Sequence, residues 1–147
     1  FITSDKIASS YKRPGASTFG GNPVTSVSAL ATLDVINKYN LVDNAKTMGE
    51  YLKEKLKELQ GKYALIGDVR GRGLMLGAEL INQGKEPAVQ ETDAILEYMK
   101  DKGVLIGKTG SNRNVLAFQP PLIIDENNID ELTDVLDGAL KYVEERK

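Results

Sequence analysis

The stretch Ser17-Thr18-Phe19-Gly20-Gly21-Asn22-Pro23 is the part of the sequence best suited to hold a ligand. Two hydroxyl residues and two glycines stand directly before a long run of apolar residues. Asn22 can cap a helix whose first residue is Pro23, a position where the missing N–H costs nothing. Free N–H groups at such a helix start, together with the helix dipole, attract anions. The stretch therefore predicts an anion site, with an ordinary capped loop as the alternative.

A second candidate is the segment from Gly67 to Gly73, which carries Arg70 and Arg72 among glycines. Guanidinium groups bind carboxylates and phosphates through paired N–H groups, so the segment suits an anion-recognition turn. The alternative is a tight hairpin whose arginines pair with neighbouring acids, as exposed ion pairs often do. The glycine spacing does not fit a dinucleotide fingerprint, and Gly107-Lys108-Thr109 does not complete a P-loop.

Composition excludes several classes of function. The chain has 147 residues, a net charge of −2 and no histidine or cysteine. Without these residues there is no His-based catalytic triad and no usual zinc site, and we predict no metal. Chemistry must then rest on lysine, carboxylates, tyrosine, Ser/Thr or a cofactor. The slightly acidic balance gives no electrostatic case for nucleic acid or an anionic membrane, and we expect a cytoplasmic protein.

Hydrophobic periodicity predicts an α+β arrangement. We expect a short helix from Ser4-Asp5 to Tyr11, a strand tail at Phe1-Ile2-Thr3, and a turn at 70–72. Longer helices are expected over 23–39, 41–59, 89–102 and 127–144, with Gly61 ending the second of them. The first of the longer helices has a broad apolar face, which predicts a largely buried helix. Strands are expected at 64–66, 73–81, 104–106 and 114–118, paired in an antiparallel or mixed sheet that helices cover on one face.

Three segments in a fixed order carry a family resemblance. They are Thr18-Phe19-Gly20-Gly21-Asn22-Pro23, then Gly67-Asp68-Val69-Arg70-Gly71-Arg72-Gly73-Leu74-Met75, then Asn114-Val115-Leu116 with Pro120-Pro121-Leu122. Together they resemble the C-terminal part of the class III pyridoxal-phosphate aminotransferases, nearest the alanine–glyoxylate, acetylornithine and ornithine-like branches. The resemblance implies a fold-type I enzyme. Residues 1–40 would end its large cofactor-binding domain, and residues 41–147 would form its small C-terminal α+β domain.

The resemblance also implies a function for the parent enzyme. Such an enzyme moves an amino group between an amino acid or amine and a 2-oxo acid or aldehyde, as a homodimer with shared active sites. Thr18, with Ser17, would contact the phosphate of pyridoxal 5'-phosphate in the partner subunit. The Schiff-base lysine of the family lies upstream of the region matching Phe1. We therefore expect no catalytic residue in this chain, a fragment of a longer enzyme, and no transaminase activity of the chain alone.

One position departs from the family pattern. Many relatives carry an arginine after Asn-Val-Leu that binds the substrate α-carboxylate, and here that position is Ala117. Losing a guanidinium is not a conservative change. Arg113 is the nearest replacement cation, and Gln119 can offer a hydrogen bond instead, so both are candidate substrate-binding residues. A racemase or lyase of the same family, a non-catalytic α+β binding or assembly module, and an anion-binding regulatory domain using Arg70 and Arg72 stay open as alternatives.

Overall fold

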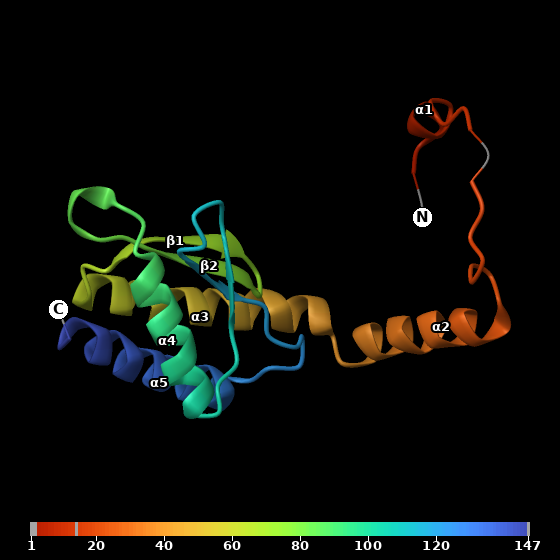
Figure 1. Cartoon of the computed structure of the whole chain (residues 1–147). Helices are drawn as coiled ribbons and strands as arrows, with labels where there is room; N and C mark the ends of the chain where they lie inside the picture. Colours follow the sequence, from red (N-terminus) through yellow and green to blue (C-terminus); the bar gives the residue numbers. More distant parts are fainter. Residues whose placement is uncertain (1–2, 14, 147) are drawn as a thin grey trace. The chain divides into compact units, whose positions relative to one another are not determined.

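The computed structural model describes residues 3–13 and 15–146 (Figure 1). Contacts within the chain divide it into two units, Phe1–Asn37 and Lys38–Lys147. The assignment of 1–40 and 41–147 to two domains of a larger enzyme stays a prediction. The strand expected at Phe1-Ile2 lies outside the described residues, and Thr3 is not part of a strand.

The first unit contains α1 (Asp5–Ala8) and most of α2 (Pro23–Lys38). Helix α1 ends at Ala8 instead of Tyr11, and the side chain of Ser4 makes no capping hydrogen bond. The start of α2 is confirmed. The Asn22 carboxamide oxygen accepts a hydrogen bond from the backbone N–H of Thr25 at 3.1 Å, and Pro23 is the first helical residue.

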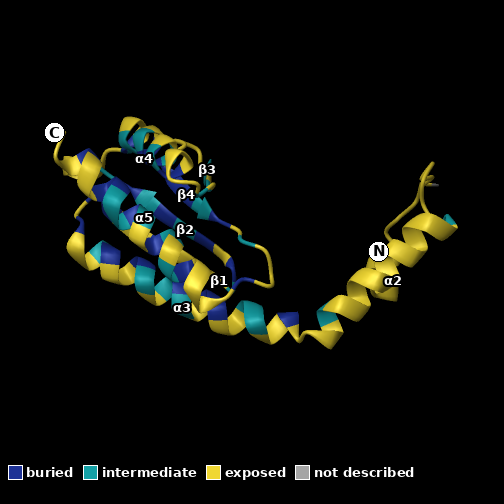
Figure 2. Ribbon diagram, turned by 90° about the horizontal axis from the view of Figure 1, so that it is seen from below, coloured by how far each residue is buried: buried dark blue, intermediate teal, exposed yellow. Residues whose placement is uncertain are grey.

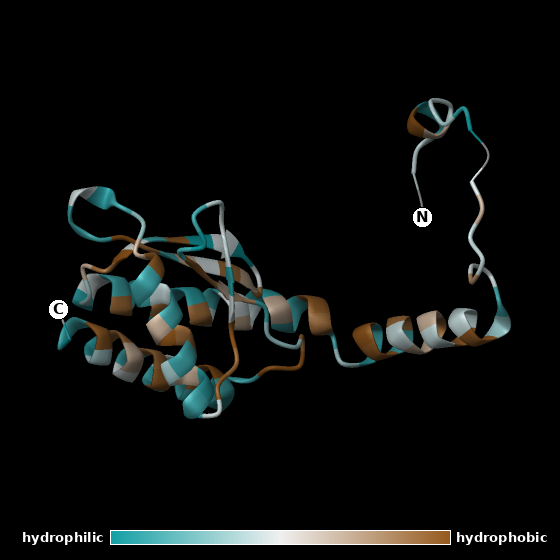
Figure 3. Cartoon of the chain, in the orientation of Figure 1, coloured by the Kyte–Doolittle hydropathy of each residue, from teal (hydrophilic) through white to brown (hydrophobic). Residues whose placement is uncertain are grey.

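Helix α2 is exposed, contrary to the expectation of a largely buried helix. Every residue of α2 except Ile36 is exposed, including Val24, Val27, Leu30 and Leu33. Figure 3 shows apolar residues distributed along this helix. The sequence pattern predicts a helix with an apolar face, but such a face is buried only where another surface packs against it. Among the described residues of this unit, the only other helix is the single turn α1, which has no buried residue.

The second unit is built on one antiparallel sheet with the strand order β1-β2-β4-β3. Its strands are β1 (Ile66–Arg72), β2 (Met75–Leu80), β3 (Gly107–Thr109) and β4 (Val115–Phe118). The antiparallel form of the predicted sheet is thus confirmed. The turn expected at 70–72 is wrong, because Arg72 still pairs with Met75 and the reversal falls at Gly73-Leu74. Gly73 has a φ of +53°, the left-handed conformation that a two-residue hairpin turn requires.

Two further expectations in this unit are corrected. Residues 104–106 form no strand, and the pairing of β3 with β4 begins only at Gly107. Helix α3 (Leu41–Lys62) passes through Gly61 instead of ending there. A single glycine costs a helix only about 1 kcal/mol relative to alanine, which is small beside the burial of the apolar residues along α3.

Helices α3, α4 (Val89–Asp101) and α5 (Glu126–Glu144) pack with the sheet around one core (Figure 2). A short 3₁₀ turn, η1 (Gln83–Lys85), precedes α4. Along β2, buried Leu76, Ala78 and Leu80 alternate with residues that are exposed or half-buried, so one sheet face meets the helices. Helix α3 packs along β1 and β2, and α5 packs against α3 and α4. The core includes the fully buried residues Leu52, Leu56, Leu80, Ile95, Met99, Leu116, Phe118, Ile129, Leu136 and Leu140.

Candidate functional site

The loop before α2 presents two free hydroxyl groups. Ser17 and Thr18 are exposed, and among the described residues neither side chain has a hydrogen-bond partner. The Asn22 carboxamide nitrogen donates to the carbonyl of Phe19 at 2.6 Å and closes the loop, while Gly21 has a φ of +73° that favours glycine. The first turn of α2 contains no acidic residue. Hydroxyl donors beside a helix start fit the oxygens of a phosphate group.

A separate pocket of about 380 Å³ lies in the second unit, between the ends of β3 and β4 and the helix α5. It contains Ala117 and Gln119, two of the positions that the sequence singled out. None of its lining residues is charged, and Gln119 is the only one with a polar side chain. The lining residues are Leu105, Ile106, Gly107, Ala117, Phe118, Gln119, Pro120, Pro121 and Leu132. The pocket therefore suits an uncharged, largely apolar group with one hydrogen-bonding atom.

Arg113 does not line this pocket. It lies in the turn between β3 and β4, is exposed, and has a φ of +56°. Strand β4 runs from Val115 to Phe118, so Arg113 and Gln119 flank opposite ends of the same strand. The structure brings Ala117 and Gln119 together and leaves Arg113 apart from them. The substrate contact of Arg113 stays a prediction.

Two glycines beside Ala117 were not expected to belong to this region. Ala117 pairs with Gly77 of β2 on one side and with Gly107 of β3 on the other. The three small residues form a row across the sheet, on the face opposite buried Leu116 and Phe118. Beside this row, the side chain of Val115 lies over Gly77, because a Cβ atom on Gly77 would stand 3.0 Å from its Cγ1 atom. Only strand register reveals the row, because the three residues lie 30 and 10 positions apart along the chain.

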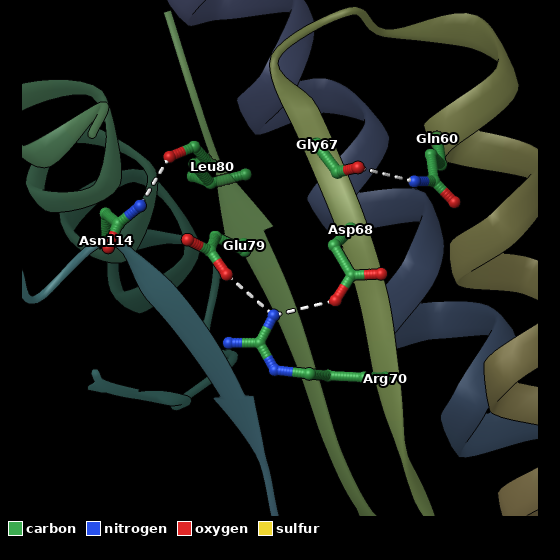
Figure 4. Close-up of polar contacts among 7 residues, drawn as sticks. All are labelled: Gln60, Gly67, Asp68, Arg70, Glu79, Leu80 and Asn114. Atoms are coloured by element: carbon green, nitrogen blue, oxygen red, sulfur yellow. Dashed lines mark hydrogen bonds and ion pairs between the residues drawn. The ribbon is translucent and has the colours of Figure 1, made fainter. Parts of the chain in front are cut away.

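Arg70 pairs with neighbouring acids, which agrees with the hairpin alternative and not with an anion-binding turn. Its Nη1 atom donates to Asp68 at 2.8 Å and to Glu79 of the neighbouring strand at 2.6 Å (Figure 4). These two hydrogen bonds, first that to Asp68, raise the pKa of the Arg70 guanidinium. Two carboxylates therefore balance this cation. Arg72 has no acidic partner among the described residues.

Two lysines of α3 form ion pairs with carboxylates of α5. Lys55 contacts Asp130 at 2.8 Å, and Tyr51 donates to the same carboxylate at 2.7 Å. Lys62 binds both oxygens of Asp137, at 2.6 and 2.8 Å. The hydrogen bonds to these carboxylates raise the pKa of Lys55 and of Lys62. Both side chains therefore stay protonated at neutral pH and are poor nucleophiles. The expectation that this chain holds no catalytic residue stays a prediction.

Among the described residues there is no group of three acidic, histidine or cysteine side chains arranged to hold a metal ion. No helix in the same part of the chain combines the length and apolar character needed to cross a membrane.

A family model described as "Aminotransferase class-III" matches residues 1–140. The chain belongs to this family. It is 47% identical over 142 residues to alanine–glyoxylate aminotransferase 2 homolog 2, mitochondrial, of Arabidopsis thaliana, covering 95% of the chain and 30% of that protein. It is 40% identical over 137 residues to taurine–pyruvate aminotransferase of Bilophila wadsworthia, covering 88% of the chain and 30% of that protein.

Relatives with other activities also occur. The chain is 34% identical over 124 residues to the alanine/serine racemase of Pyrococcus horikoshii, covering 84% of the chain and 26% of that protein. Among solved structures, a phospholyase from Arthrobacter in complex with phosphoethanolamine superposes with a TM-score of 0.87 at 31% identity, covering 95% of the chain and 34% of that structure. An S-selective transaminase from Arthrobacter with alanine bound gives 0.80 at 32% identity, covering 95% and 33%.

These matches confirm the family resemblance and the α+β fold. The fold matches the C-terminal third of fold-type I structures. The chain spans about 30% of the length of the curated relatives that it matches. The family uses pyridoxal phosphate. The contact of Ser17 and Thr18 with the phosphate of that cofactor stays a prediction. The Arabidopsis relative is named as mitochondrial, and a cytoplasmic location of this chain stays a prediction.

Proposed function

We propose that this chain forms the C-terminal portion of a pyridoxal-phosphate-dependent aminotransferase. The whole enzyme would transfer an amino group between an amino acid or amine and a 2-oxo acid or aldehyde. The observation that carries the proposal is the family match over residues 1–140 by a chain that spans only 30% of its aminotransferase relatives.

The loop before α2 would hold the cofactor. Pyridoxal phosphate, when bound, supplies the electron sink for amino transfer. Thr18 and Ser17 would donate hydrogen bonds to its phosphate group, in a homodimer whose two active sites share residues. The lysine that binds the cofactor covalently would come from polypeptide outside this chain, so the chain alone would not catalyse transfer. The exposed apolar residues of α2 support this division, because such a helix needs a covering surface.

The pocket at Ala117 and Gln119 would receive part of the substrate. Its lining carries no cation, so a carboxylate placed there would lose hydration without gaining an ion pair. We therefore propose that the group entering this pocket is uncharged and that Gln119 forms a hydrogen bond to it. Arg113 remains a second candidate contact, for a carboxylate held at the other end of β4.

A second candidate function is a lyase or racemase that uses the same cofactor. The similarity to an alanine/serine racemase and to a phospholyase structure supports it. A non-catalytic α+β binding or assembly module is a third reading. It is the weaker one, because a module has no need of the free hydroxyls of Ser17 and Thr18 beside a helix start.

A chimaera tests the proposal. This chain would replace the matching C-terminal 30% of the Arabidopsis relative, and cofactor retention and products would be measured. We expect the chimaera to retain pyridoxal phosphate. We also expect it to convert a 2-oxo acid to an amino acid while an equal amount of the amino donor is consumed. Release of ammonia or phosphate, or inversion of alanine, would instead establish the lyase or racemase alternative.

The role of Thr18 is tested in the same chimaera. Thr18→Ala removes one hydrogen-bond donor and is expected to weaken cofactor retention about tenfold. Ser9→Ala, which removes an exposed hydroxyl outside the loop, is the control. Equal retention by Thr18→Ala and the parent chimaera would contradict the proposed contact. Treatment of the 147-residue chain alone with pyridoxal phosphate and borohydride should give no stoichiometric adduct in its intact mass.

A further inference from the structure

A second hollow in the same unit carries an excess of positive charge. It has a volume of about 280 Å³ and lies between the first half of α3 and the β1–β2 hairpin. Its lining residues are Lys46, Gly49, Glu50, Lys53, Gly71, Arg72, Gly73 and Leu76. It shares no residue with the pocket of Ala117 and Gln119. The lining of the hollow thus contains three cationic side chains and one carboxylate.

Close packing of two glycines holds the walls of this hollow together. A side chain on Gly49 would lie 2.3 Å from the carbonyl group of Gly73, so the helix and the hairpin turn meet with no side chain between them. Lys53 is half-buried, and its Nζ atom donates to the carbonyl of Gly71 at 3.2 Å. The lysine is therefore positioned by the hairpin instead of extending into solvent.

The cations of this hollow are not neutralised within it. Arg70, two residues away on β1, is balanced by Asp68 and Glu79, whereas Arg72 and Lys46 have no acidic partner among the described residues. Glu50 is the one acid in the lining. The lining has a net charge of +2, from the three cations Lys46, Lys53 and Arg72 and the single carboxylate of Glu50.

We propose that this hollow is a binding site for a small phosphate-class dianion. Arginine and lysine form their strongest hydrogen bonds with oxyanions, and two charges on the ligand match the +2 of the lining. The second arginine of the Gly67–Gly73 segment then has the anion-binding role that Arg70 does not have. The site is independent of the proposed amino transfer.

Titration of the full chain with inorganic phosphate tests the site, followed by calorimetry and by amide NMR shifts. We expect one saturable site whose affinity falls with added salt. Arg72→Gln and Lys53→Gln should each weaken binding about tenfold, since each removes a charged hydrogen-bond donor. Glu50→Gln should strengthen binding, because it removes the only negative charge from the lining.

Arg70→Gln is the matched control, because it removes an arginine from the same strand but outside the hollow. We expect it to leave phosphate affinity unchanged. Thermal unfolding of each variant verifies that it folds. Lys53→Arg should bind phosphate much as the unmodified chain does, because it keeps the positive charge that Lys53→Gln removes. Titration with succinate distinguishes a phosphate site from a general dianion site. No saturable binding, or equal loss in Arg70→Gln and Arg72→Gln, would overturn the proposal.

Discussion

Gly49 of α3 lies directly against the main chain of Gly73 in the β1–β2 turn. A Cβ atom on Gly49 would stand 2.3 Å from both the carbonyl carbon and the carbonyl oxygen of Gly73. Real Cβ atoms do not approach backbone atoms so closely, so only glycine fits at this point of the helix. The contact fixes the hairpin against α3 and so places Lys53 and Arg72 on the same hollow.

Gly49→Ala should therefore destabilise the chain. The added methyl group meets rigid backbone instead of a flexible side chain, and we expect a loss of about 1–3 kcal/mol in the free energy of unfolding. Gly61→Ala in the same helix is the control, because nothing lies within 4 Å of its added Cβ. It should stabilise the chain by about 0.5–1 kcal/mol through helix propensity. Urea unfolding measures both, and a neutral Gly49→Ala would contradict the close packing.

Core packing in the second unit predicts a contrast between two leucines. Leu52 of α3 is 0% exposed, whereas Leu30 of α2 is 61% exposed. Leu52→Ala should cost about 2–5 kcal/mol, because it leaves a cavity in the core. Leu30→Ala should change the stability of the isolated chain by less than about 0.5 kcal/mol. A large loss for Leu30→Ala, measured by chemical unfolding at several concentrations, would show that α2 is already covered, for example by a second copy.

The sequence predicts the elements of the second unit better than their junctions. Periodicity places α3, α4 and α5, because one face of each helix must enter the core. The turn expected at 70–72 lies instead at Gly73-Leu74, because only strand register shows that Arg70 and Arg72 pair with β2. Residues 104–106 have a strand-like composition, but the pairing with β4 begins only at Gly107.

The candidate site is predictable only in part. Local rules identify the Asn22 cap and the free hydroxyls before α2, because these depend on neighbours in the sequence. The pocket at Ala117 joins residues from Leu105 to Leu132, and the cationic hollow joins Lys46 to Leu76. Such sets form only when distant segments pack. The burial of α2 fails as a prediction for a related reason, since an apolar pattern does not say which surface covers it.

The buried side-chain amide of Asn114 is expected to contribute to the stability of the second unit. Its side chain is 2% exposed, and its Nδ2 atom donates to the carbonyl of Leu80 at 2.7 Å (Figure 4). Asn114→Ala removes this bond and leaves a small cavity between β2 and β4, at an expected cost of about 1–3 kcal/mol. Asn112→Ala, at an exposed position in the adjacent turn, should have almost no effect. Equal thermal midpoints for the two variants would contradict the structural role of Asn114.

The ion pair between Lys62 and Asp137 predicts a pH dependence of stability. Hydrogen bonding to Lys62 lowers the pKa of the Asp137 carboxyl, so its folded pKa lies below the unfolded value of about 3.9. The stabilisation is therefore complete above that unfolded pKa and is lost as the pH falls through the folded pKa. Asp137→Asn should lower stability at pH 7 and flatten the decline of stability in acid. Asp134→Asn makes the same charge change at an exposed position without an ion pair among the described residues. Thermal unfolding from pH 7 to pH 2 compares the two, and identical acid profiles would contradict a stabilising Lys62–Asp137 pair.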